Sequence, residues 1–135
     1  MYATTLELGA LDALTRDEQH RALNQVLLAL AKVDAIYLRR HPQTPPLYRS
    51  GVVYRDEPDD GESWADVSVV LNRGFGHCAE LAAWRTAELW RAGNRFARPI
   101  VTEYDRPDLL TWHAIVQVHP WRTEDPSLRL GMKGF

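Results

Sequence analysis

The sequence predicts an α+β fold in which one buried helix packs on a small antiparallel sheet, with an amphipathic helix preceding both. Apolar residues recur at helical spacing within residues 15–41, 63–73 and 78–92. Two strand-like runs, residues 97–104 and 111–119, follow close together. Helices followed by neighbouring strands are typical of α+β domains. The length of 135 residues fits a single domain that can bury a core without disulfides or metal sites.

The N-terminal helix is expected over residues 15–41. Thr15 and Glu18 have capping-box spacing at its start, and Pro42 stops it. The apolar stripe that this helix must bury consists of Leu23, Val26, Leu27, Leu30, Val33 and Tyr37. Partial alternation within residues 5–8 predicts a short strand before the helix.

Short elements and turns are expected between the first and the central helix. Residues 52–57, VVYRDE, predict a short strand, and residues 58–63 predict a loop. Ser63 is a candidate N-cap for a helix over residues 63–73, which Gly74 ends.

The central helix is expected over residues 78–92. Alanine, leucine and tryptophan occur on most of its sides, so it should be largely buried, and Gly93 is a natural C-terminal cap. The two longer strands that follow are separated by the turn at residues 105–109. A third, short strand comes next, and Pro126 is expected to stop it.

Composition excludes several classes of protein. The chain is 45% hydrophobic and 25% charged with a net charge of -2, so no basic surplus favours nucleic acid or an anionic membrane as partner. One cysteine excludes an intramolecular disulfide and the zinc sites that need several thiolates. No segment approaches the roughly 18 apolar residues of a membrane span, and no leader pattern is present. A cytoplasmic location, or packaging in a particle, is therefore expected.

The candidate catalytic residues are Cys78, His113 and Asp125. Cys78 follows the glycine-containing turn RGFGH and opens the central helix, where unpaired backbone N–H groups favour a thiolate. His113 lies in a predicted strand, and Asp125 lies at the end of the next one. Because consecutive antiparallel strands lie side by side, Asp125 could accept a hydrogen bond from His113 and orient it. Such a set needs no metal or cofactor.

These segments resemble the transglutaminase-like branch of the papain-like cysteine enzymes. GFGHCAELAAW, GNRFARPIV, HAIVQV and EDPS follow the order of that family's glycine-rich turn and helix-opening cysteine, arginine-bearing strand, histidine strand and Asp-Pro end. The resemblance covers about residues 63–132 and implies a papain-like catalytic core. It also implies that Cys78 is the nucleophile, His113 the base and acid, and Asp125 the orienting group. The whole chain is further similar to small proteins of this type encoded by bacteriophages and prophages.

Two residues are candidate side-chain donors to an oxyanion. Papain-like enzymes carry a side-chain amide six residues before the cysteine, and Asn72 occupies that spacing here. Trp64 is the second candidate, provided that its indole N–H faces the site.

Simpler explanations exist for the individual residues. A lone cysteine is most often a small core residue, and an aspartate before proline is common in turns. A metal site of His77, Glu80 and His119 is a weaker alternative, because the sequence lacks the Cys-x-x-Cys pattern of zinc deaminases. We therefore expect no metal.

Together the motifs predict a cysteine hydrolase or acyltransferase that acts on an amide or peptide bond through a thioester, with a protein or peptide as substrate. Hydrolysis and amine transfer both stay open, as does the oligomeric state. The alternative is a papain-like scaffold or binding protein without turnover, such as a phage particle component or assembly factor. For a phage-encoded protein, phage structural proteins are candidate partners, and host cytoplasm or virion is the expected location.

Overall fold

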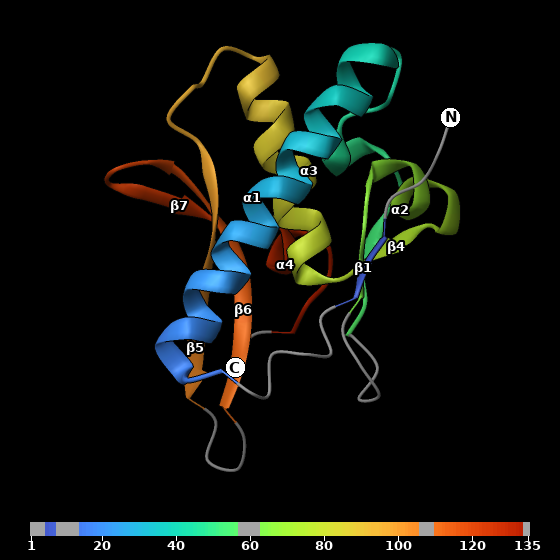
Figure 1. Ribbon diagram of the computed structural model, residues 1–135. Helices are drawn as coiled ribbons and strands as arrows, with labels where there is room; N and C mark the ends of the chain where they lie inside the picture. The colour runs from blue at the N-terminus through green and yellow to red at the C-terminus, as the bar shows by residue number, and fades with distance from the viewer. Residues whose placement is uncertain (1–4, 8–13, 57–62, 106–109, 134–135) are drawn as a thin grey trace.

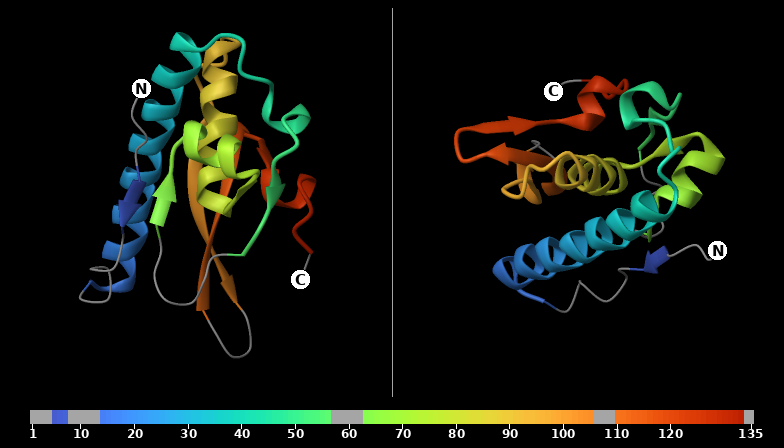
Figure 2. Two further views of the ribbon diagram at one scale, coloured as in Figure 1. Left: turned by 90° about the vertical axis from the view of Figure 1, so that its right-hand side faces the viewer. Right: turned by 90° about the horizontal axis from the view of Figure 1, so that it is seen from above.

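The computed structural model describes residues 5–7, 14–56, 63–105 and 110–133. These residues form a mixed α+β structure, as the sequence predicts. Viewed from above, the central helix α3 (Cys78–Arg91) lies between the long helix α1 (Arg16–Arg40) and the hairpin of two strands, β6 (Leu110–His119) and β7 (Arg122–Glu124) (Figure 2). Most of the expected turn at residues 105–109 and most of the expected loop at residues 58–63 lie outside the described residues.

Helix α1 spans Arg16–Arg40 and confirms the predicted capping box. The backbone N–H of Glu18 donates to Thr15 Oγ1 at 3.2 Å, and the backbone N–H of Thr15 donates to Glu18 Oε1 at 2.8 Å. The residues that α1 buries completely or nearly so include Leu23, Leu27 and Leu30 from the predicted stripe. In the described part of the chain, no helix combines the length and the apolar character needed to cross a bilayer.

The three-stranded sheet confirms the predicted antiparallel meander. β5 (Arg98–Asp105) pairs with β6 (Leu110–His119), which pairs with β7 (Arg122–Glu124). The outer edge of β5 faces α1 (Figure 1). There the backbone N–H of Val101 donates to Asn24 Oδ1 at 2.8 Å, and its carbonyl accepts from His20 Nε2 at 2.6 Å. Side chains of α1 thus bind the backbone of this edge strand.

In each of the two short strand pairs, the sequence predicted one strand but not its partner. β1 (Thr5–Glu7) is the expected first strand, and it pairs antiparallel with β3 (Ser63–Ala65), which the sequence did not reveal. β2 (Val53–Tyr54) falls within the expected strand at 52–57 and pairs in parallel with β4 (Phe75–Gly76). A strand of two or three residues shows almost no periodicity, so only its distant partner defines it.

The predicted helix at residues 63–73 begins later than expected, and its predicted cap was wrong. α2 spans Val67–Arg73, and its N-cap is Asp66, whose Oδ1 accepts from the Val69 N–H at 3.3 Å. Ser63 instead belongs to β3. Serine and aspartate are equally good caps, and pairing with β1 decides between them by holding residues 63–65 extended.

The C-terminal ends of α2 and α3 follow the prediction. α2 ends at Gly74, which has φ +84°, in the left-handed region that favours glycine. Helix α3 spans Cys78–Arg91, with Ala92 as C-cap and Gly93 at φ +99° immediately after it. α3 is largely buried, and its residues Leu81 and Trp84 are 0% exposed.

Pro126 was predicted to stop the last strand, and it also begins a helix. α4 spans Pro126–Arg129, with Asp125 as N-cap and the proline in its first turn. Proline suits this position because its missing N–H would have no partner within the helix. The remaining short helix, η2 (Leu47–Arg49), is a 3₁₀ turn that lies beside α3.

Candidate active site

Cys78 is the first residue of α3, as predicted, and the residue is half-buried. The side chain packs against the core cluster that includes Trp64 on β3, Ala79 on α3 and Ala114 on β6. The preceding glycine is needed for close packing, because a Cβ at Gly76 would lie 2.7 Å from Leu81 Cδ2. The turn before the cysteine therefore needs two glycines for different reasons: Gly74 for its positive φ, and Gly76 for its close contact with Leu81.

His113 and Asp125 form the hydrogen-bonded pair that the sequence predicted. His113 Nε2 lies 2.8 Å from Asp125 Oδ2, and the two side chains are 4% and 16% exposed. A carboxylate only accepts, so Nε2 carries the proton in this bond. Asp125 Oδ1 also accepts from the Leu128 N–H at 3.3 Å, which caps α4. Ala114, the residue after His113, lies in the cluster that Cys78 packs against, so the backbone of β6 at this point lies near the start of α3.

Glu80 is a buried residue whose structural role sequence reasoning missed. It is 1% exposed, and its Oε1 accepts from the His77 N–H at 2.8 Å and from the Arg73 guanidinium. Its Oε2 accepts from the Ala65 N–H at 2.7 Å. This one carboxylate therefore joins β3, the end of α2 and the N-cap of α3, next to Cys78. The three-residue spacing between the N-cap and Glu80 is the signal that could have revealed it.

Asp34 is a second buried carboxylate, and it binds the backbone at the start of α2, two residues after Ala65. It is 0% exposed on α1, and its Oδ1 accepts from the Val67 N–H at 3.0 Å. Burial raises the pKa of Asp34 well above its ordinary value of 3.8. The Val67 N–H opposes this increase, whereas the carboxylates of Asp66 and Glu80 add to it.

The two candidate oxyanion donors differ in their placement. Trp64 is 4% exposed and belongs to the core cluster that Cys78 contacts. Asn72 lies on α2 and is exposed to solvent, whereas the buried face of that helix carries Val67 and Val70. An oxyanion donor acts best in a site that excludes water, so the structure gives Asn72 no support in this role.

The residues of the alternative metal site do not gather. Glu80 is bonded to backbone and arginine, and His77 Nδ1 lies 2.8 Å from the carbonyl oxygen of Arg55, to which it donates. His119 lies at the far end of β6, stacked on Trp121. Among the residues that the structure describes, no three histidine, cysteine, aspartate or glutamate side chains are placed to bind a metal ion.

Comparisons with protein-family models, with curated proteins and with solved structures found no match. The likeness to transglutaminase-like enzymes therefore stays a prediction that depends on the sequence motifs.

Proposed function

We propose that this protein is a cysteine hydrolase or acyltransferase that acts on an amide or peptide bond, with Cys78, His113 and Asp125 as its catalytic residues. The observation that carries the proposal is the 2.8 Å bond between His113 Nε2 and Asp125 Oδ2. The sequence motifs assign these two residues the roles of base and orienting group. A histidine held by a carboxylate has a fixed tautomer and ring orientation, which proton transfer requires.

The position of the cysteine supports the same chemistry. Cys78 begins a helix of 14 residues, where backbone N–H groups without helical partners favour an anion. Cys78 is partly exposed, in contrast to the buried Ala79 beside it. A purely structural cysteine has no requirement for this location or for partial exposure.

The proposed reaction has two steps, acylation of Cys78 and deacylation. His113 takes the proton of the Cys78 thiol, and the resulting thiolate attacks the carbonyl carbon. As the C–N bond breaks, His113 donates that proton to the nitrogen, which releases an amine and leaves a thioester. Water or a second amine then attacks the thioester, loses a proton to His113 and displaces Cys78. Because Nε2 binds Asp125, these proton transfers fall to Nδ1 of His113. Backbone N–H groups at the start of α3, with Trp64 as a candidate side-chain donor, would stabilise the oxyanion.

A protein or peptide is the proposed substrate class, with phage structural proteins as candidates if the chain is phage-encoded. Whether water or an amine accepts the acyl group depends on the substrate-binding surface, so the proposal covers both outcomes. The host cytoplasm or the virion is the proposed location.

Labelling with an electrophilic peptide tests the proposal directly. The protein, Cys78→Ala and His113→Ala would each be incubated with a peptide vinyl sulfone and analysed by intact mass. We expect one adduct on the wild type, none on Cys78→Ala, and at least tenfold slower labelling of His113→Ala, because the histidine activates the thiol.

Iodoacetamide serves as the control for thiol access. It should label both the wild type and His113→Ala, since both keep the partly exposed cysteine. If wild type and His113→Ala react with the peptide probe at the same slow rate, the cysteine is an ordinary thiol. The papain-like scaffold without turnover would then be the better interpretation.

A further inference from the structure

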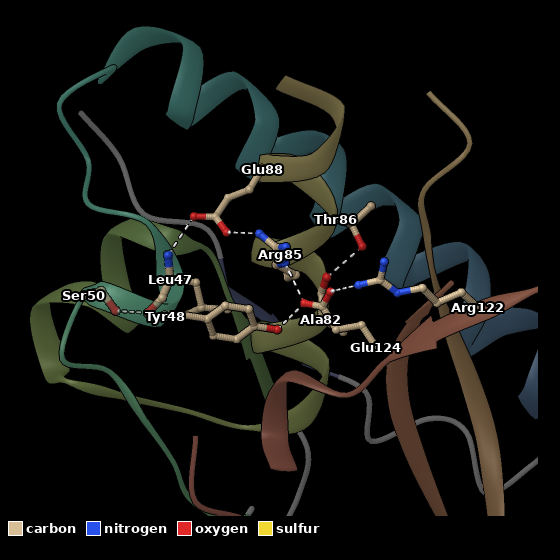
Figure 3. Close-up of polar contacts among 9 residues, drawn as sticks. All are labelled: Leu47, Tyr48, Ser50, Ala82, Arg85, Thr86, Glu88, Arg122 and Glu124. Carbon is tan, nitrogen blue, oxygen red and sulfur yellow. Dashed lines mark hydrogen bonds and ion pairs between the residues drawn. The ribbon is translucent and has the colours of Figure 1, made fainter. Parts of the chain in front are cut away.

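Glu124, the last residue of β7, is the centre of a polar network between β7, α3 and η2 (Figure 3). Its side chain is 7% exposed. Glu124 Oε1 accepts hydrogen bonds from Arg85 Nε at 2.7 Å and from the Tyr48 hydroxyl. Arg122 Nη2 lies 4.0 Å from Oε2. The carboxylate is thus bound by side chains from three separate elements.

The partners of Glu124 are themselves fixed. Arg85 Nη1 donates to Glu88 Oε1 at 3.3 Å, and Glu88 Oε2 accepts from the Leu47 N–H at 2.7 Å. The guanidinium of Arg85 lies 5.0 Å from the centre of the Tyr48 ring. Burial favours a higher pKa for Glu124, but the hydrogen bonds from Tyr48 and Arg85 outweigh it and lower the pKa. Burial and the bond to Glu124 raise the pKa of Tyr48, so the phenol keeps its proton and donates to an ionised carboxylate.

Asp125 follows Glu124 directly in the chain, so the network fixes its backbone. β7 has only three residues, and its register on β6 contains a shift. The bond from the Leu128 N–H to Asp125, at 3.3 Å, is longer than the 2.7 Å bond between Arg85 and Glu124. The bonds of the Glu124 side chain therefore add a restraint immediately before Asp125, beyond backbone pairing and helix capping.

The same helix carries the candidate nucleophile and the arginine that binds Glu124. Cys78 and Arg85 are seven residues apart, which places them on one face of α3, about 10 Å apart along its axis. Because a helix is stiff over two turns, the position of the thiol and the position of β7 are linked through one rigid element.

We propose that Tyr48, Arg85 and Glu124, here called the Glu124 clamp, are positioning residues that hold Asp125 against His113. They act through Asp125 and touch no reacting atom. The inference rests on the proposed function only for the catalytic role of Asp125. The bond between His113 and Asp125 can be measured whether or not the protein turns over.

Proton NMR of the hydrogen-bonded imidazole tests the clamp. A proton shared between histidine Nε2 and a carboxylate gives a downfield signal that exchanges slowly with water, and its loss in Asp125→Asn would assign it to His113. The test variant is Arg85→Gln, which removes the charged bond to Glu124. The matched control is Arg16→Gln, because Arg16 Nε also donates to a glutamate Oε1, that of Glu103, at 2.7 Å. The guanidinium of Arg16 also lies 5.0 Å from the centre of an aromatic ring, that of Trp112.

We expect the downfield signal in the wild type and in Arg16→Gln, and its loss or severe broadening in Arg85→Gln. Labelling of Arg85→Gln by the peptide vinyl sulfone should fall roughly tenfold or more, because a small displacement of a catalytic group has effects of this size. If Arg85→Gln does not fold, Tyr48→Phe decides the question, since it removes a single hydroxyl from the clamp and should weaken the signal.

A full signal in folded Arg85→Gln, or in Tyr48→Phe where that variant decides, overturns the inference. So does the absence of the signal from the wild type, because the His113–Asp125 bond is then not formed as described. If the signal responds as expected but the peptide probe labels neither the wild type nor any variant, the clamp is upheld and the proposed function fails.

Discussion

The buried carboxylate of Asp34 should make the stability of this protein fall as the pH rises. Burial raises the pKa of Asp34 well above 3.8, so the folded protein holds a proton that the unfolded chain releases. The stability that this proton provides is complete below the unfolded pKa and is lost as the pH rises toward the folded pKa. Within that window the contribution of Asp34 to the free energy of unfolding falls by about 1.4 kcal/mol for each pH unit.

The substitution Asp34→Asn isolates this effect. The amide cannot ionise, and its oxygen can still accept from the Val67 N–H, which lies 3.0 Å from Asp34 Oδ1. Asp34 Oδ2 is buried without a hydrogen-bond partner among the described residues, and the amide NH₂ that replaces it would add a constant penalty of about 1–3 kcal/mol. The variant should therefore gain on the wild type by about 1.4 kcal/mol for each pH unit above 3.8, up to the folded pKa.

Urea unfolding of both proteins between pH 3 and 7, followed by tryptophan fluorescence, measures this difference. The decisive quantity is the slope of the stability difference against pH, because the constant penalty does not affect it. A difference that stays flat between pH 4 and 6 would show that Asp34 ionises normally in the folded protein, which would refute the reasoning.

Four further outcomes follow from the site. Alkylation of Cys78 should be substantial below pH 7, whereas a rate that rises only near the free-thiol value of about 8.5 would argue against a nucleophile. Asp125→Asn should leave the fold intact and lower turnover, by up to the roughly 10⁴-fold seen in serine triads; near-normal turnover would contradict the orienting role. Glu80→Ala should lower the free energy of unfolding by about 3–5 kcal/mol, because it leaves Arg73 and two backbone N–H groups without their acceptor; a loss below about 1 kcal/mol in urea unfolding would be inconsistent with this junction. Asn72→Ala should change neither the thermal midpoint nor turnover by much, and a fall in turnover of about 10²–10³ would instead assign Asn72 to the oxyanion hole.

The features that could be predicted from the sequence are those that depend on residues close together in the chain. The capping box of α1, the glycines that follow α2 and α3, and the meander of the larger sheet all depend on residues close together in the chain. The pair of His113 and Asp125 was predictable for the same reason, because β6 carries His113 and Asp125 directly follows the adjacent antiparallel strand β7.

Features that depend on distant partners were not predictable. β3 exists because residues 63–65 pair with β1, and no pattern within three residues reveals that. Asp34 looks like a solvent-exposed charge of an amphipathic helix, yet it binds the backbone of Val67 in the interior. The spacing of Glu80 from the N-cap indicates its bond to His77, but not its second bond to the distant backbone of Ala65. Such bonds depend on how the helices pack, and a single sequence shows that only weakly.

The contact between α1 and β5 determines where the sheet can grow. An edge strand normally offers a row of free N–H and C=O groups to any extended peptide, including a second copy of the chain. On β5 the two outward groups of Val101 are already bound by Asn24 and His20. Pro99, which points the same way two residues earlier, has no N–H to offer. A strand added at this edge would have to displace two side-chain bonds and pass a position without a donor, so β5 resists both β-augmentation and edge-to-edge aggregation.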